Sequence, residues 1–137
     1  MGTIRDRLNR LIDDYCSEDE WVSIDAEEQI ISICKEIMIK MNDIYSRLEL
    51  FNMHFDVNIV NIYTFGDDSI IFETEENYYT RFEYSYLDID MDEYFERCKR
   101  LKLEELKTTV DRLTQQIEKL NEKRKEIMRF SNGKETV

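Results

Sequence analysis

Apolar residues recur along two long segments of the chain, with the alternating three- and four-residue steps of a heptad repeat. The first series consists of Ile30, Cys34, Ile37, Met41, Ile44, Leu48 and Phe51. Ile31, Met38 and Tyr45 flank it, so the apolar stripe is wider than a two-stranded coiled coil needs. The pattern predicts a helix over residues 25–53 that contacts more than one neighbour and begins with a capping box at Asp25.

The second series lies in residues 91–130, where a long helix is predicted. Its apolar members, here called the C-terminal seam, are Leu103, Leu106, Val110, Leu113, Ile117, Leu120 and Ile127. Branched residues alternate with leucines in the centre of this seam, a pattern that favours parallel dimers. The flanking positions hold Lys102, Lys107, Thr109, Thr114, Gln116, Asn121 and Lys123. These residues lack the opposite charges that would specify a homodimer, so packing on residues 25–53 stays open, although we expect a homo-oligomer.

Between the two heptad segments, the pattern changes to the two-residue period of β-strands. Strands are predicted at residues 56–65, 69–75 and 78–89, separated by short turns. In the third strand, one face carries Tyr78, Thr80, Phe82, Tyr84 and Tyr86. Because the connections are short, the strands should form an antiparallel meander.

The N-terminal segment carries apolar side chains on one helical face over residues 3–15. Residues 16–23 break this pattern and predict a loop, whose Trp21 and Val22 should fold back onto the core. These segments predict a helix and a loop before the first heptad helix.

The whole pattern predicts an α+β fold with N-terminal helices, a three-stranded antiparallel β-meander and a long C-terminal heptad-patterned helix. The chain contains no proline and only 3 glycines in 137 residues, which fits long helices with few irregular loops. We expect one domain over residues 1–130, with Gly133 ending the last helix and a flexible tail at residues 131–137.

Charge is distributed unevenly along the chain. Residues 11–96 carry 23 acidic and 4 basic side chains, whereas residues 97–137 carry 12 basic and 7 acidic ones. The sequence shows no signal peptide, and its most apolar stretch is too short and too charged to cross a bilayer. We therefore expect a cytoplasmic protein with an acidic body, a mildly basic C-terminal helix and no membrane partner.

Three alternating aspartates, Asp88, Asp90 and Asp92, resemble the first ligands of a calcium-binding loop. That loop requires glycine at its sixth position and glutamate at its twelfth, and this chain has Glu93 and Lys99 there. We interpret the segment as the start of the last helix, with Asp90 and Glu93 as its capping box. No metal and no cofactor are predicted.

Enzymatic chemistry has few candidate residues. The three cysteines, Cys16, Cys34 and Cys98, are widely spaced, and His54 is the only histidine. A small enzyme that uses Cys34 or His54 is the weakest hypothesis, because a nucleophile needs an adjacent base. Direct nucleic-acid binding is not expected either, since residues 66–96 carry eleven carboxylates against Arg81 alone.

The acidic surface suggests a non-enzymatic protein that binds other proteins. Its best candidate residues for partner binding are Asp67, Asp68, Glu73, Glu75, Glu76, Glu83 and Asp88. The sharper hypothesis is a decoy: carboxylates that imitate a nucleic-acid backbone and inhibit a nucleic-acid-handling protein, as inhibitors encoded by phages and other mobile elements do. A solvated surface that only provides solubility is the simpler interpretation.

An alternative comes from the layout alone. A β-meander between two long heptad helices resembles prefoldin-type chaperone subunits in outline. The resemblance is one of architecture, and it implies a coiled-coil chaperone- or scaffold-like protein whose helix tips grip their clients.

Overall fold

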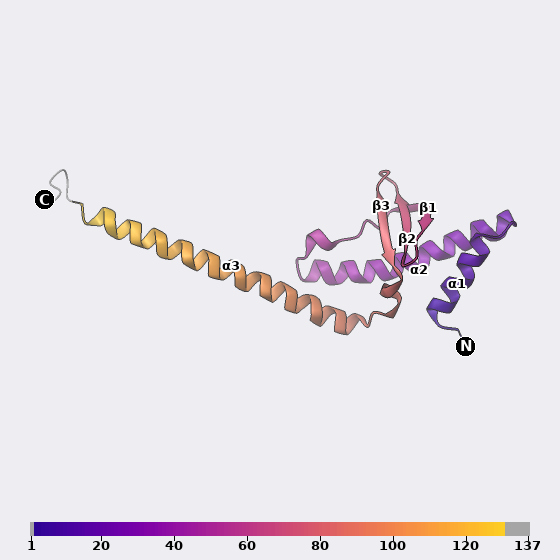
Figure 1. The fold of residues 1–137 in the computed structure, drawn as a ribbon, viewed down its shortest axis with the longest axis horizontal. Helices are drawn as coiled ribbons and strands as arrows, with labels where there is room; N and C mark the ends of the chain where they lie inside the picture. The colour runs from indigo at the N-terminus through magenta and orange to yellow at the C-terminus, as the bar shows by residue number, and fades with distance from the viewer. Residues whose placement is uncertain (1, 131–137) are drawn as a thin grey trace. The chain divides into compact units, whose positions relative to one another are not determined.

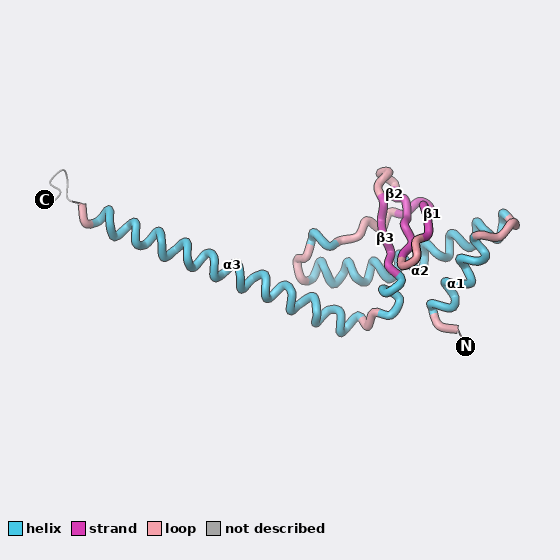
Figure 2. Tube along the Cα trace, viewed as in Figure 1, coloured by secondary structure: helices cyan, strands magenta, loops and turns pink. Residues whose placement is uncertain are grey.

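The computed structural model of the chain describes residues 2–130 (Figures 1 and 2). Its elements are α1 (Ile4–Tyr15), α2 (Glu20–Arg47), η1 (Phe51–Met53), β1 (Ile59–Phe65), β2 (Ser69–Thr74), β3 (Tyr79–Glu83), η2 (Tyr84–Asp88) and α3 (Met91–Met128), where η marks a 3₁₀ helix. The predicted α+β fold is confirmed, and the predicted tail with Gly133 lies outside the described residues. Within residues 2–130, every helix is too short or too polar to cross a lipid bilayer.

The chain divides into two compact units, and the boundary falls inside α3, after Cys98. All residues that are buried within the described range 2–130 belong to the first unit. Its largest fully buried side chains are Tyr45, Phe72, Phe82, Leu8, Ile30, Met38, Met41 and Ile70. The described part of the second unit is the remainder of α3, from Lys99, followed by Arg129 and Phe130.

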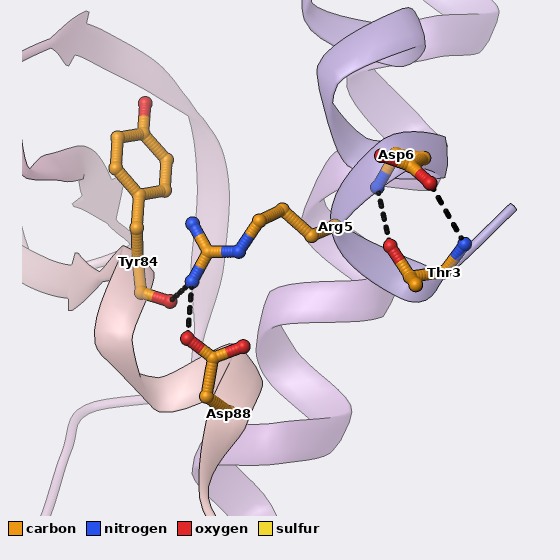
Figure 3. Close-up of polar contacts among 5 residues, drawn as sticks. All are labelled: Thr3, Arg5, Asp6, Tyr84 and Asp88. Atoms are coloured by element: carbon orange, nitrogen blue, oxygen red, sulfur yellow. Dashed lines mark hydrogen bonds and ion pairs between the residues drawn. The ribbon is translucent and has the colours of Figure 1, made fainter.

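Helix α1 begins at a capping box formed by Thr3 and Asp6 (Figure 3). The Thr3 hydroxyl accepts the backbone N–H of Asp6, and the Asp6 carboxylate accepts the backbone N–H of Thr3, each at 3.1 Å. This arrangement satisfies two N–H groups that a helix start leaves without partners. Leu8 and Leu11 are buried, so the predicted apolar face packs into the core.

Helix α2 starts earlier than the sequence pattern predicts. The Asp19 carboxylate accepts the backbone N–H groups of Trp21 at 2.9 Å and Val22 at 3.2 Å, which makes Asp19 the N-cap. The predicted loop at residues 16–23 is therefore shorter, covering residues 16–19, and the predicted capping box at Asp25 is wrong. Trp21 does not fold back onto the core either, because the side chain is 83% exposed.

Helix α2 also ends earlier, at Arg47 rather than at residue 53. Glu49 adopts a left-handed conformation with φ of 56°, and the N–H of Leu50 donates to the carbonyl of Tyr45 at 2.7 Å. This is the Schellman arrangement that closes a helix C-terminus, with glutamate where glycine is usual. Leu50 is consequently buried, while Phe51, the last predicted member of the first series, is exposed.

The three strands form an antiparallel sheet in the order β1-β2-β3, as predicted. Ile70, Phe72 and Phe82 on its inner face are fully buried and join one hydrophobic cluster with side chains of α1 and α2. The edge strand β1 has register irregularities between Ile59 and Asn61 and between Ile62 and Thr64. Such bulges bend a strand locally and disturb its pairing.

Strand β3 is shorter than predicted and ends at Glu83 instead of residue 89. Its last paired residue, Glu83, lies opposite Ser69, which is the first residue of β2. The central strand therefore offers no partner beyond this point, and the chain turns into η2. Tyr84 and Tyr86 still pack against the core from this turn, although the alternation of a strand has ended.

Helix α3 begins after Asp90, whose carboxylate accepts the backbone N–H groups of Asp92 at 3.0 Å and Glu93 at 3.2 Å. The aspartate that resembled a calcium ligand is thus engaged in capping the helix. Asp92 and Glu93 also lie in the first turn, where the helix dipole favours negative charge.

Replacing Asp90 with alanine should lower the free energy of unfolding by about 1 kcal/mol, because two N–H groups lose their acceptor. Urea unfolding measures this loss. Glu96→Ala, one turn further along and exposed, is the matched control and should change stability by less than about 0.5 kcal/mol. Added calcium should leave the melting temperature of the native protein unchanged, and a calcium-dependent rise would contradict the capping interpretation.

Candidate interaction surfaces

The seven carboxylates predicted to bind a partner do not form a single cluster. Asp67 and Asp68 lie in the turn between β1 and β2, whereas Glu75 and Glu76 lie in the turn between β2 and β3. These turns are at opposite ends of the six-residue strand β2, about 20 Å apart at 3.3 Å per residue. The structure therefore separates the residues into two groups, and their role in partner binding stays a prediction.

Arginines pair with three of the seven predicted carboxylates. Arg81 lies 3.0 Å from the Asp68 carboxylate and 3.6 Å from that of Glu83. The Arg5 guanidinium donates to the Asp88 carboxylate at 2.6 Å and to the backbone carbonyl of Tyr84 at 2.9 Å (Figure 3). These contacts are partly exposed, so each ion pair contributes little stability, but each places a positive charge within the predicted surface.

The outer face of the sheet carries an aromatic pair that the sequence pattern did not single out. The rings of Tyr63 on β1 and Tyr79 on β3 meet edge to face, with centroids 4.6 Å apart. The neighbouring Tyr63 raises the pKa of Tyr79 above its usual value, with smaller contributions from desolvation and Glu73. Phe82, which a base-stacking surface would need to expose, is buried on the inner face.

Neither candidate enzyme residue has the surroundings of an activated nucleophile. Cys34 is fully buried, and burial raises the pKa of its thiol far above the usual value, so the reactive thiolate is disfavoured. The His54 Nε2 atom lies 2.7 Å from the Ser46 hydroxyl, and its ring stacks on Phe51. This exposed contact connects the chain after α2 to the last turn of that helix. Cys16 is exposed and Cys98 is buried.

A groove of about 670 Å³ lies between α2 and the first turns of α3, within the first unit. Arg47 and Phe95 both line this groove, and the Arg47 guanidinium lies over the Phe95 ring, 4.6 Å from its centroid. Nearby, the hydroxyls of Tyr45 and Tyr94 form a hydrogen bond of 2.6 Å. Sequence reasoning missed these contacts, because no local pattern relates residues nearly fifty positions apart.

The C-terminal seam remains uncovered along the second unit. Its seven side chains are between 45% and 67% exposed, although helix α3 is continuous from Met91 to Met128. Lys102 pairs with Glu105 at 3.7 Å and Lys125 pairs with Glu122 at 3.8 Å, each within one turn of this helix. The second unit thus presents an ordered apolar stripe to its surroundings.

Comparison of this chain with protein-family models, with curated proteins and with solved structures finds no match.

Proposed function

We propose that this chain is a non-enzymatic protein-interaction protein that acts through a coiled coil formed by its C-terminal seam. The observation that carries the proposal is the exposure of all seven seam side chains on one continuous helix. Contiguous apolar surface of this kind marks interaction sites, because monomeric soluble proteins rarely leave it open to water.

Burial of the apolar surface of the C-terminal seam would supply free energy for binding. Fully burying a leucine, isoleucine or valine side chain contributes roughly 1.5–3 kcal/mol, at about 25 cal/mol for each Å² of apolar surface. Leu103 to Ile127 span about 36 Å along the helix axis at 1.5 Å per residue. A second helix lying along this stripe would cover all seven side chains. The other side chains of α3 cannot cover them.

The acidic first unit is compatible with this proposal as a solubilising body. The decoy hypothesis stays a prediction, and two observations weaken it: the candidate carboxylates lie at both ends of the sheet, and arginines pair with three of them. The two mechanisms differ in their response to salt. A decoy that depends on exposed charges should lose its partner as ionic strength rises, whereas a buried apolar seam should retain most of its affinity.

The direct test is affinity capture of partners from the native host with two matched variants. Leu113→Glu places a charge in the middle of the seam and should abolish recovery of the partner. Gln115→Glu introduces the same side chain two residues away, on the opposite face of the helix, and should recover the partner as the unmodified chain does. If both variants recover the same proteins in the same amounts, the seam is not the binding surface.

A further inference from the structure

We infer that the helix which covers the C-terminal seam belongs to another protein and carries acidic residues at the positions that flank its own apolar seam. This inference depends on the proposed function and adds the chemistry of the partner. It is based on the positions that charged and hydroxyl side chains occupy around the axis of α3.

Charges are sorted by face around this helix. From Leu103 to Ile127, all acidic residues lie at positions that point away from the seam: Glu104, Glu105, Asp111, Glu118, Glu122 and Glu126. The charged residues at seam or flanking positions are all cationic: Lys102, Lys107, Lys123 and Arg124. In coiled coils, residues that flank the seam select the partner through charge complementarity. The stripe is therefore bordered by positive charge alone.

A second copy of this chain cannot supply the missing counter-charge. It would bring the same cationic or neutral residues to the flanks in either orientation, because no acidic residue occupies a seam or flanking position. In a parallel pair, Lys102 would lie near Lys107 of the second copy, and the two Arg124 side chains would face each other. Lys102 contacts Glu105 of its own helix at 3.7 Å, but the Glu105 side chain is 62% exposed and lies outside the flanking positions, so this pair does not supply the acidic residues that the flanks lack.

Two threonines beside the centre of the seam can be covered by another helix without losing their hydrogen bonds. The Thr109 hydroxyl donates to the carbonyl of Glu105 at 3.0 Å, and the Thr114 hydroxyl donates to that of Val110 at 2.8 Å. Both threonines occupy flanking positions, and both already have a hydrogen-bond partner within their own helix. Covering them with another helix therefore leaves no hydroxyl without a partner, which removes the main penalty for burying a polar group.

These features specify the partner as an amphipathic helix of roughly four heptads. Apolar residues at its own seam would pack on Leu106, Val110, Leu113, Ile117 and Leu120. Glutamate or aspartate at its flanking positions would meet Lys107 and Lys123, and an acid opposite Arg124 would fix the register, as single polar seam residues do.

The test uses the full chain and two synthetic helical peptides, each about four heptads long with isoleucine and leucine at the seam. One peptide has glutamate at every flanking position, and the other has lysine. Binding is measured by fluorescence anisotropy at low salt and again at about 0.5 M salt, where exposed charges are screened. The glutamate peptide should bind at least about tenfold more tightly at low salt, and the difference should shrink at high salt.

Charge reversal provides the matched controls. Lys107→Glu combined with Lys123→Glu should invert the preference, so that the lysine peptide binds more tightly. Lys119→Glu combined with Arg129→Glu makes the same change in net charge at outward positions and should leave the preference as it is. If both double variants shift the preference toward the lysine peptide by the same amount, the preference depends on net charge alone and the inference is overturned.

The remaining outcomes separate this inference from the proposed function. If the chain alone sediments as a dimer that Leu113→Glu dissociates, the occupant is a second copy; the inference is then overturned and the proposed function stands. Equal binding of both peptides would overturn only the inference that the partner helix is acidic. If neither peptide binds and the chain stays monomeric at all concentrations, the proposed function fails as well.

Discussion

Phe82→Ala should destabilise the first unit by about 3–5 kcal/mol, several times the loss expected from removing a helix cap. Phe82 is fully buried on the inner face of β3, opposite Ile70, and its ring meets that of Tyr86 edge to face at 5.4 Å. Since small domains have only about 5–15 kcal/mol of total stability, this loss is a large fraction of the whole and should lower the urea midpoint strongly. Urea unfolding followed by circular dichroism measures the loss.

The neighbouring Arg81→Ala is the control for Phe82→Ala, because successive strand residues point to opposite faces of the sheet. Arg81 is exposed and makes only surface ion pairs with Asp68 and Glu83, so its loss should change stability by less than about 1 kcal/mol. If both variants lose a comparable amount of stability, the placement of Phe82 on the inner face and Arg81 on the outer face of β3 is wrong.

Ending the chain after Lys102 should abolish binding of the glutamate peptide while leaving the urea midpoint of the first unit unchanged. The shortened chain lacks all seven seam residues, but it keeps every residue that is buried within the described range 2–130. Fluorescence anisotropy with the peptide and urea unfolding of the same preparation test both parts of this expectation.

A chain that ends after Met128 is the control, because it keeps the whole seam and should bind the peptide as the full chain does. A markedly lower urea midpoint for the chain ending at Lys102 would mean that the later part of α3 stabilises the first unit. Binding by that shorter chain would mean that the peptide docks somewhere other than the seam.

The sequence was sufficient to predict the elements in which apolar and polar residues recur with a clear local period. The apolar face over residues 3–15 indicated α1, and the three strands and their antiparallel order followed from the two-residue period and the short turns. The heptad pattern correctly indicated both long helices. It could not indicate that the first series would be buried and the second exposed, because the spacing of apolar residues is the same in the two cases.

The errors occurred at the ends of elements, where contacts decide between local alternatives. The sequence pattern indicated Asp25 as the helix cap, but the helix begins six residues earlier, where Asp19 is the cap. The chain ended α2 at a left-handed Glu49, a conformation that sequence does not suggest for glutamate. Strand β3 ended because β2 has no further residue to pair with it, which is a property of the neighbouring strand.

The candidate site was predictable only in part. The C-terminal seam and its cationic flanks are visible in the sequence. By contrast, the bonds from Arg5 to Asp88 and to the carbonyl of Tyr84 join α1 to η2 across about eighty residues. The same holds for the Arg47–Phe95 contact in the groove beside α2. Contacts of this range depend on the completed fold, so a pattern of acidic residues could not reveal which carboxylates would be paired.

The exposed position of Trp21 at the start of α2 determines what optical spectroscopy can report about this protein. Trp21 is the only tryptophan, and its indole is surrounded by water in the folded state, so its emission should change little on denaturation. The buried Tyr45 and the partly buried Tyr84, Tyr86 and Tyr94 are the better optical reporters of the folded core. A blue shift of the tryptophan emission on mixing with another protein would therefore report contact at this end of α2 and not a change in folding.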